Sequence, residues 1–227
     1  MRFVLVPGAG GAGWYWHRVV PFLEGAGHSA IAVDLPADDD TAGLPEYAAL
    51  VLDAAQGHED VVLVGQSLGG FTVPLVARDL VEAGTTPRGI VLVNPMIPAP
   101  GETPGDWWEN VGHAEARVEA ANAGGWPVDF DLETAFLHDV DVAVVASGEQ
   151  HQRVEAEAVF VSVCDITAWP GVPTQVISGA EDRFFPLAFQ QRIARERLGL
   201  EPTVVPGGHL VALSQPEALT AALLDGD

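Results

Sequence analysis

Six short apolar runs, separated by segments of helical length, constrain the fold of this chain more than any other feature of its sequence. The runs are rich in Val, Ile and Leu and hardly alternate with polar residues, which is typical of parallel strands buried on both faces. The expected strands are Phe3–Val6, Ala30–Leu35, Val61–Gly65, Ile90–Asn94, Thr174–Ser178 and Thr203–Val205, and the expected helices are Tyr15–Gly25, Leu44–Ala55, Gly69–Ala83, Leu187–Leu198 and Pro216–Leu224. This alternation predicts an α/β fold with a doubly wound, mostly parallel sheet.

The alternation stops between residues 97 and 168. This stretch opens with the Pro- and Gly-rich sequence IPAPGETPGDWW and continues with amphipathic segments at Asp106–Ala123 and Glu149–Val163. So long a stretch without strands exceeds an ordinary loop. We therefore expect a mainly helical cap at 97–168, inserted into an α/β core formed by residues 1–96 and 169–227.

Composition narrows the classes of function. The chain has 227 residues, enough for one sizeable domain, and 32 acidic against 10 basic residues give it a net charge of -22. Such a surface repels nucleic acid and anionic membranes, so the expected partner is a small-molecule substrate. The single cysteine, Cys164, excludes an internal disulfide and is interpreted as a buried apolar residue. No signal peptide and no bilayer-spanning run is visible, which favours a cytoplasmic protein; the oligomeric state stays open.

A serine lies at the junction of the third expected strand and the following helix. Gly65-Gln66-Ser67-Leu68-Gly69 matches G-x-S-x-G in the strand–turn–helix context that this motif requires. A sharp turn forces the serine toward positive φ, and the positions two before and two after it must be small to avoid the neighbouring strand and helix. The pattern predicts a nucleophilic Ser67.

A nucleophilic serine needs a base that a third group orients, and two later strand ends supply candidates. Asp182 follows the strand in TQVISGAEDRFFP, where it competes with Glu181, and His209 follows the strand in TVVPGGHL. Both lie at carboxyl ends of strands, where open α/β sheets place their sites. The other histidines are interpreted as surface or packing residues without metal-ligand spacing: His17, His28, His58, His113, His138 and His151.

The first strand leads into a glycine cluster that also fits a dinucleotide-binding fingerprint. Gly8, Gly10 and Gly13 match G-x-G-x-x-G, and Asp34 lies where a ribose partner is expected. Two features argue against a nucleotide site. Three bulky aromatic residues follow Gly13, and the chain has no lysine, which a short-chain dehydrogenase needs for catalysis. Asp34 is then interpreted as a structural carboxylate of the loop.

The chain resembles the α/β-hydrolase superfamily over essentially its whole length, in the segments VLVPGAGGAGWYWHRVVPFLEGAGHSAIAVDLP, VGQSLGG, EDRFFPLAFQQRIA and PGGHLVALSQPEAL. The similarity is strongest to the small branch that contains plant-type esterases and hydroxynitrile lyases. The resemblance implies Ser67 as nucleophile, Asp182 as acid and His209 as base, with no metal or organic cofactor. It further implies an oxyanion hole built from the backbone N–H groups of Ala9 and Leu68, with Pro7 where the family usually has His.

The expected activity is hydrolysis of a small to medium, mostly apolar ester or lactone through an acyl-enzyme. Candidate substrate-binding residues are Trp107, Trp108, Phe184 and Leu210, although packing of the cap on the core explains the two tryptophans equally well. One alternative is a hydroxynitrile lyase. The lyases of this branch carry a lysine directly after the catalytic histidine, and Leu210 in that position leaves a cyanide ion without a cationic partner. The other alternative, a catalytically silent binding protein, conflicts with a complete triad.

Overall fold

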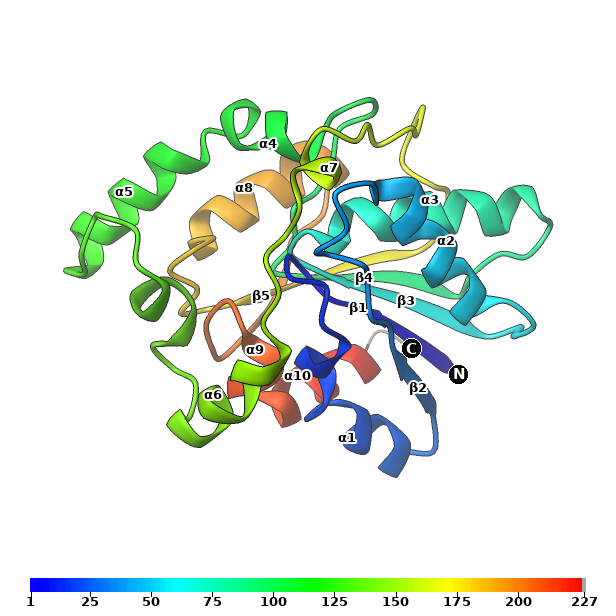
Figure 1. Ribbon diagram of the computed structural model, residues 1–227, viewed down its shortest axis with the longest axis horizontal. Coiled ribbons are helices and arrows are strands. Elements are labelled where there is room, and N and C mark those ends of the chain that lie inside the picture. The colour runs from blue at the N-terminus through cyan, green and yellow to red at the C-terminus, as the bar shows by residue number, and fades with distance from the viewer. Residues whose placement is uncertain (226–227) are drawn as a thin grey trace.

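A six-stranded, fully parallel sheet forms the centre of the protein. The computed structural model describes residues 1–225, and its strand order is β2-β1-β3-β4-β5-β6 (Figure 1). The strands are β1 (Arg2–Val6), β2 (Ser29–Ala32), β3 (Val61–Gln66), β4 (Gly89–Val93), β5 (Thr174–Gly179) and β6 (Thr203–Val205), and every neighbouring pair is parallel. The doubly wound parallel sheet predicted from the sequence is confirmed.

Helices cover both faces of the sheet. One face carries α2 (Leu44–Ala55), α3 (Gly69–Glu82) and α8 (Leu187–Leu198), and the other carries α1 (Val20–Gly25), α9 (Val211–Ser214) and α10 (Pro216–Leu224) (Figure 1). The helix expected at Tyr15–Gly25 is divided into a 3-10 turn, η1 (Gly13–Trp16), and the short α1. Pro21 lies in the first turn of α1, where its missing N–H costs nothing.

The core has two halves because successive strand residues point to opposite faces. Val4 and Leu63 belong to the cluster under α2, α3 and α8, whereas Phe3, Leu5 and Val62 belong to the cluster under α1 and α10. The second strand is shorter than expected, since the chain leaves the sheet after Ala32 and the Leu35 N–H donates to the Gly11 carbonyl. This exit brings Asp34 to the glycine loop.

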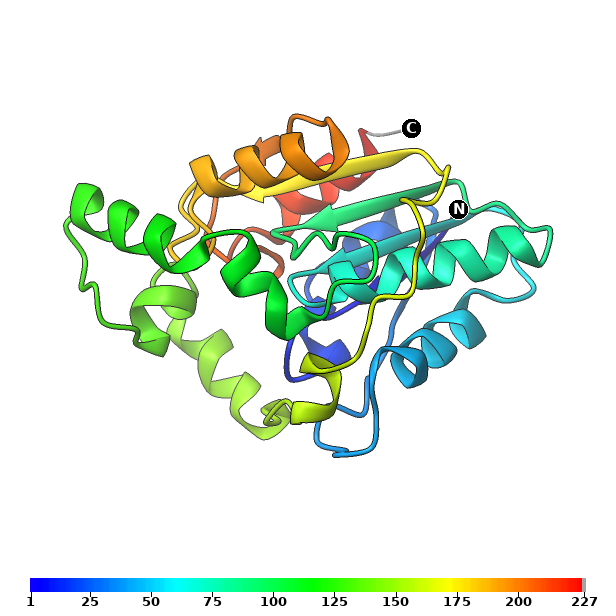
Figure 2. The same ribbon diagram turned by 90° about the horizontal axis from the view of Figure 1, so that it is seen from above.

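The segment 97–168 holds helices and no strand, and it lies beyond the carboxyl ends of the strands (Figure 2). It comprises α4 (Pro104–Asn110), α5 (His113–Gly124), the π-helical turn η2 (Glu133–Leu137), α6 (Val142–Gly148), the 3-10 turn η3 (Glu149–His151) and α7 (Glu157–Phe160). One expected helix is divided at Gly112, which has a φ of +61°. The helix expected at Glu149–Val163 is wrong over 152–156, because this part is extended and bonds to the core.

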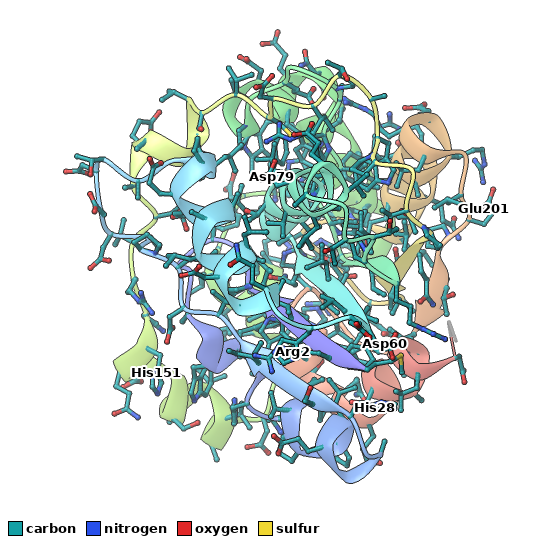
Figure 3. The ribbon with its side chains drawn as sticks, turned by 90° about the vertical axis from the view of Figure 1, so that its right-hand side faces the viewer. Arg2, His28, Asp60, Asp79, His151 and Glu201 are labelled. Atoms are coloured by element: carbon teal, nitrogen blue, oxygen red, sulfur yellow. The ribbon has the colours of Figure 1, made fainter. Side chains whose placement is uncertain are left out.

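The amino ends of the strands lie at the opposite edge, where charged groups gather. Asp60 is labelled there in Figure 3, and its carboxylate lies 3.5 Å from the Met1 ammonium and 3.7 Å from the Arg88 guanidinium. Across residues 1–225, no helix combines the length and apolarity needed to span a bilayer. The carboxyl edge, in contrast, faces the helical segment, and the candidate site lies there.

Candidate active site

Ser67 occupies a strained turn between β3 and α3. Its φ is +49°, the left-handed region that a non-glycine residue rarely adopts. A Cβ on Gly65 would lie 2.7 Å from the Gly69 carbonyl oxygen, and a Cβ on Gly69 would lie 2.8 Å from the Pro7 carbonyl oxygen. The steric requirement predicted for this turn is therefore present, and it leaves the hydroxyl at the carboxyl edge of the sheet.

Three side chains that are distant in sequence meet beside this turn. The Ser67 Oγ lies 3.1 Å from His209 Nε2, and His209 Nδ1 lies 2.8 Å from Asp182 Oδ2. All three residues are buried. A hydroxyl, an imidazole and a carboxylate in this order can transfer a proton away from the serine while holding the imidazole in one tautomer.

Asp182 rather than Glu181 is the carboxylate that contacts the imidazole. Backbone N–H groups of Phe184 and Phe185 donate to Asp182 Oδ1 at 2.9 and 2.8 Å, and the Gln190 amide donates to Oδ2 at 3.2 Å. Glu181 accepts instead from the Gly207 N–H, in the loop that carries the histidine. The two neighbouring acids thus hold different parts of one site.

Asn94 anchors the histidine loop from inside the protein, and sequence reasoning did not identify it. It is fully buried directly after β4 and has a φ of +42°. Its Nδ2 donates to the carbonyls of Gly208 and His209, each at 3.0 Å, and its Oδ1 accepts from the Gly179 N–H at 2.7 Å. Asparagine tolerates this backbone region better than most residues. An asparagine directly after a strand was therefore the signal in the sequence that could have indicated this position.

The helical segment also holds the histidine loop. Asp139, between η2 and α6, accepts from the Gly208 N–H at 2.6 Å. The carboxylate approaches closely, since a Cβ on Gly208 would lie 2.8 Å from an Asp139 carboxylate oxygen. The backbone beside the imidazole is therefore fixed from the sheet by Asn94 and from the segment 97–168 by Asp139.

Two N–H groups of the glycine loop after β1, those of Gly10 and Gly13, donate to carboxylates of the protein. The Gly10 N–H donates to Glu155 at 2.6 Å and the Gly13 N–H to Asp34 at 2.9 Å. Burial raises the pKa of the Glu155 carboxyl. A pyrophosphate would meet two carboxylates here instead of free amides. Asp34 also pairs with Arg153 at 2.8 Å, so its interpretation as a structural carboxylate is confirmed.

The backbone amides of Ala9 and Leu68, beside Ser67, have no acceptor among the described residues. Both residues line the same cavity as Ser67 and His209. The loop approaches the serine closely, since a Cβ on Gly8 would lie 2.9 Å from the Ser67 Cβ. These amides are the groups that the sequence analysis expects to bind an oxyanion.

A cavity of about 430 Å³ opens over the serine. Trp108, Phe184 and Leu210 line it, in agreement with their expected position, as do Phe136 and Arg153, which sequence reasoning missed. Trp107 does not line it, which corrects the expectation for this residue. Its indole is fully buried against Phe185 and donates to the Ile97 carbonyl at 3.0 Å, so it packs the helical segment on the core.

The cavity has few charged side chains in its lining. Among its described residues, Arg153 is the one Asp, Glu, Lys or Arg side chain, and its guanidinium donates to the Leu35 carbonyl as well as pairing with Asp34. Elsewhere in residues 1–225, no group of three or more His, Cys, Asp or Glu residues is placed to hold a metal ion. The cavity therefore presents apolar walls with a polar centre at Ser67 and His209.

Comparisons with known proteins agree with this architecture. The model of the alpha/beta hydrolase family matches residues 3–223. The chain is 24% identical to norfluorocurarine synthase 1 of Strychnos sp over 257 aligned residues, which cover 98% of this chain and 93% of that protein. It is 43% identical to the probable esterase PIR7A of Oryza sativa subsp. indica over 84 residues, about a third of each protein (33% and 32%).

A solved structure shows the same fold over nearly the whole chain. The pyrethroid hydrolase of Sphingobium faniae JZ-2 superposes with a TM-score of 0.77 at 22% identity, covering 99% of this chain and 96% of that one. The parallel sheet, the strained serine turn and the family match over residues 3–223 lead to one conclusion. This chain belongs to the alpha/beta hydrolase family.

Proposed function

We propose that this protein hydrolyses neutral carboxylic esters or lactones through an acyl-enzyme on Ser67. The observation that carries the proposal is the hydrogen-bonded series from Ser67 to His209 to Asp182, with distances of 3.1 and 2.8 Å. A serine hydroxyl is a weak nucleophile unless an oriented base removes its proton. Similarity to a rice protein named a probable esterase supports the same class of reaction.

The reaction proceeds in two halves. Ser67 Oγ attacks the ester carbonyl while His209 Nε2 takes its proton, and Asp182 stabilises the resulting imidazolium. The carbonyl oxygen becomes an oxyanion, which accepts from the N–H groups of Ala9 and Leu68. His209 then gives the proton to the leaving oxygen, the acyl–oxygen bond breaks, and water repeats the sequence on the acyl-enzyme.

The cavity sets the substrate class. Its volume of about 430 Å³ lies within the range of about 300–1,000 Å³ that is typical of small-molecule sites. Its guanidinium is already paired, so a charged substrate would find no free counter-ion among the described lining residues. We therefore assign a small to medium, mostly apolar and uncharged substrate, covered by the segment 97–168 acting as a cap.

The lyase alternative is not supported by the cavity. Leu210 follows the histidine and lines the cavity, and Arg153 is held by Asp34. A departing cyanide ion would meet neither a lysine nor a free guanidinium. The other candidate is a binding protein without turnover, which covalent labelling and ester kinetics separate from an esterase.

Two measurements test the proposal. A fluorophosphonate probe should label the protein covalently, and Ser67→Ala should abolish the labelling. His209→Ala should abolish turnover of p-nitrophenyl butyrate while the far-UV circular dichroism spectrum stays unchanged. A folded protein that neither reacts with the probe nor turns over the ester is a binding protein, and that result would refute the proposal.

A further inference from the structure

Two phenylalanine rings contact the imidazole of His209 on the cavity side. Phe136, in η2, and Phe184, after β5, each have a ring centroid 5.1 Å from the imidazole centroid, at interplanar angles of 77° and 80°. The two rings lie 4.5 Å apart and both line the cavity. Phe185 also contacts the imidazole but is fully buried beneath it.

The chemistry fixes which part of an ester meets these rings. The leaving oxygen must lie within about 2.6–3.2 Å of His209 Nε2 to receive its proton. The carbonyl oxygen points in another direction, toward the amides of Ala9 and Leu68. The first carbons of the alcohol are bonded to the leaving oxygen, so they meet the side chains packed around the imidazole, which are Phe136 and Phe184.

The aromatic surface continues from the site to the outside. Phe130 lies 6.1 Å from Phe136 and 6.0 Å from Phe184, ring centroid to ring centroid, and it is 55% exposed. Leu132 lines the cavity and is 54% exposed. Aromatic rings pair favourably at centroid separations of about 4.5–7 Å. The rings of Phe136 and Phe184 in the cavity thus continue into the exposed ring of Phe130.

We propose that Phe136 and Phe184 form the subsite for the leaving alcohol, and that this alcohol is neutral and aromatic, such as a benzyl-type alcohol. The inference rests on the proposed ester hydrolysis and adds the chemical class of one half of the substrate. Phe136 is the specificity-determining residue of the pair, because it belongs to the segment 97–168 over the cavity, whereas Phe184 follows the core strand β5.

The test uses esters that share an acyl group and differ in the alcohol: benzyl, cyclohexylmethyl and ethyl butyrate. All three give the same acyl-enzyme, so their deacylation rates are identical and differences in kcat/KM report the alcohol. The natural sequence should prefer benzyl over ethyl butyrate, and Phe136→Leu should lower kcat/KM for benzyl butyrate by about 2- to 10-fold. The kcat/KM for ethyl butyrate, which has no ring to lose contact, should change by less than about 2-fold. Phe22→Leu, on the exposed side of α1, is the matched control.

A second variant keeps the test valid if Phe136→Leu folds poorly. Phe130→Ala removes an exposed ring and should lower kcat/KM for 2-naphthylmethyl butyrate, which reaches further outward, while leaving benzyl butyrate nearly unchanged. An equal loss on benzyl and ethyl butyrate in Phe136→Leu, or a changed deacylation rate, would place the rings at the acyl group and overturn the inference. Absence of any turnover by the natural sequence would instead overturn the proposed hydrolysis.

Discussion

Removing the side chain of Asn94 should loosen the histidine loop and lower both stability and catalysis. In Asn94→Gly the backbone keeps its positive φ without strain, so the variant isolates the loss of the amide. The Gly208 carbonyl and the Gly179 N–H lose the Asn94 partner, and both residues are buried. The His209 carbonyl retains a longer bond from the Gln66 amide at 3.4 Å.

The structure gives the size of the effect. Each buried group left without a partner costs about 1–3 kcal/mol, so two such groups cost about 2–6 kcal/mol. Asparagine tolerates the left-handed region better than most residues, so relief of this backbone returns at most about 1 kcal/mol. We therefore expect the free energy of unfolding to fall by about 1–6 kcal/mol. Since a displacement of about 1 Å can cost about 100-fold in rate, kcat should fall at least about 10-fold with little change in KM.

Urea unfolding and p-nitrophenyl butyrate kinetics measure the two effects, and Leu23→Ala separates them. Leu23, in α1, is fully buried and forms none of the hydrogen bonds of the histidine loop, and its truncation costs about 2–5 kcal/mol. This control should lose stability and keep its kcat. If Asn94→Gly loses stability but keeps kcat as Leu23→Ala does, the amide does not position His209 and the reasoning fails. A stability loss below about 0.5 kcal/mol, the net worth of one ordinary hydrogen bond, would show that both freed groups find other partners.

Three further predictions follow from packing and titration. Gly69→Ala would place a Cβ 2.8 Å from the Pro7 carbonyl oxygen and should destabilise the fold by about 1–3 kcal/mol, whereas Gly25→Ala, with open space around it, should have no such effect in urea unfolding. Burial lowers the pKa of His113, so the unfolded chain takes up a proton near pH 6.5 before the folded protein does. Stability should therefore fall as the pH drops through 6.5. In His113→Gln, the urea midpoint of unfolding should depend less on pH in this range; an unchanged pH dependence would show that His113 is not the group responsible. Burial raises the pKa of the Cys164 thiol to about 12, so a thiol reagent should modify it far more slowly in native than in urea-unfolded protein at pH 8, and equal rates would show that the thiol is accessible.

Local patterns were sufficient to predict the parallel sheet and the three side chains that meet beside the turn at Ser67. The central strands β1, β3 and β4 are buried on both faces, which leaves continuous apolar runs in the sequence. The turn at Ser67 admits glycine alone at two flanking positions for steric reasons. Asp182 and His209 follow strands, so the parallel topology brings them to one edge of the sheet.

The local structure of the segment 97–168 could not be predicted to the same depth, because tertiary contacts decide it. Residues 152–156 carry an amphipathic pattern but run extended, since Glu155 bonds to Gly10 and the Ala156 N–H to the Ala37 carbonyl. Trp107 was a candidate for the cavity and packs in the core instead. Asn94 and Phe136 gave weak signals in the sequence, as their roles depend on which segments lie beside them in space.

Trapping the acyl-enzyme tests the central claim most directly. The protein is mixed with p-nitrophenyl butyrate, quenched in acid within the first turnovers, and analysed by intact and peptide mass spectrometry. Our account predicts a butyryl group on the peptide that contains Ser67, together with a burst of p-nitrophenol, and neither in Ser67→Ala. Turnover that persists in Ser67→Ala, or an acyl group found on another residue, would contradict it.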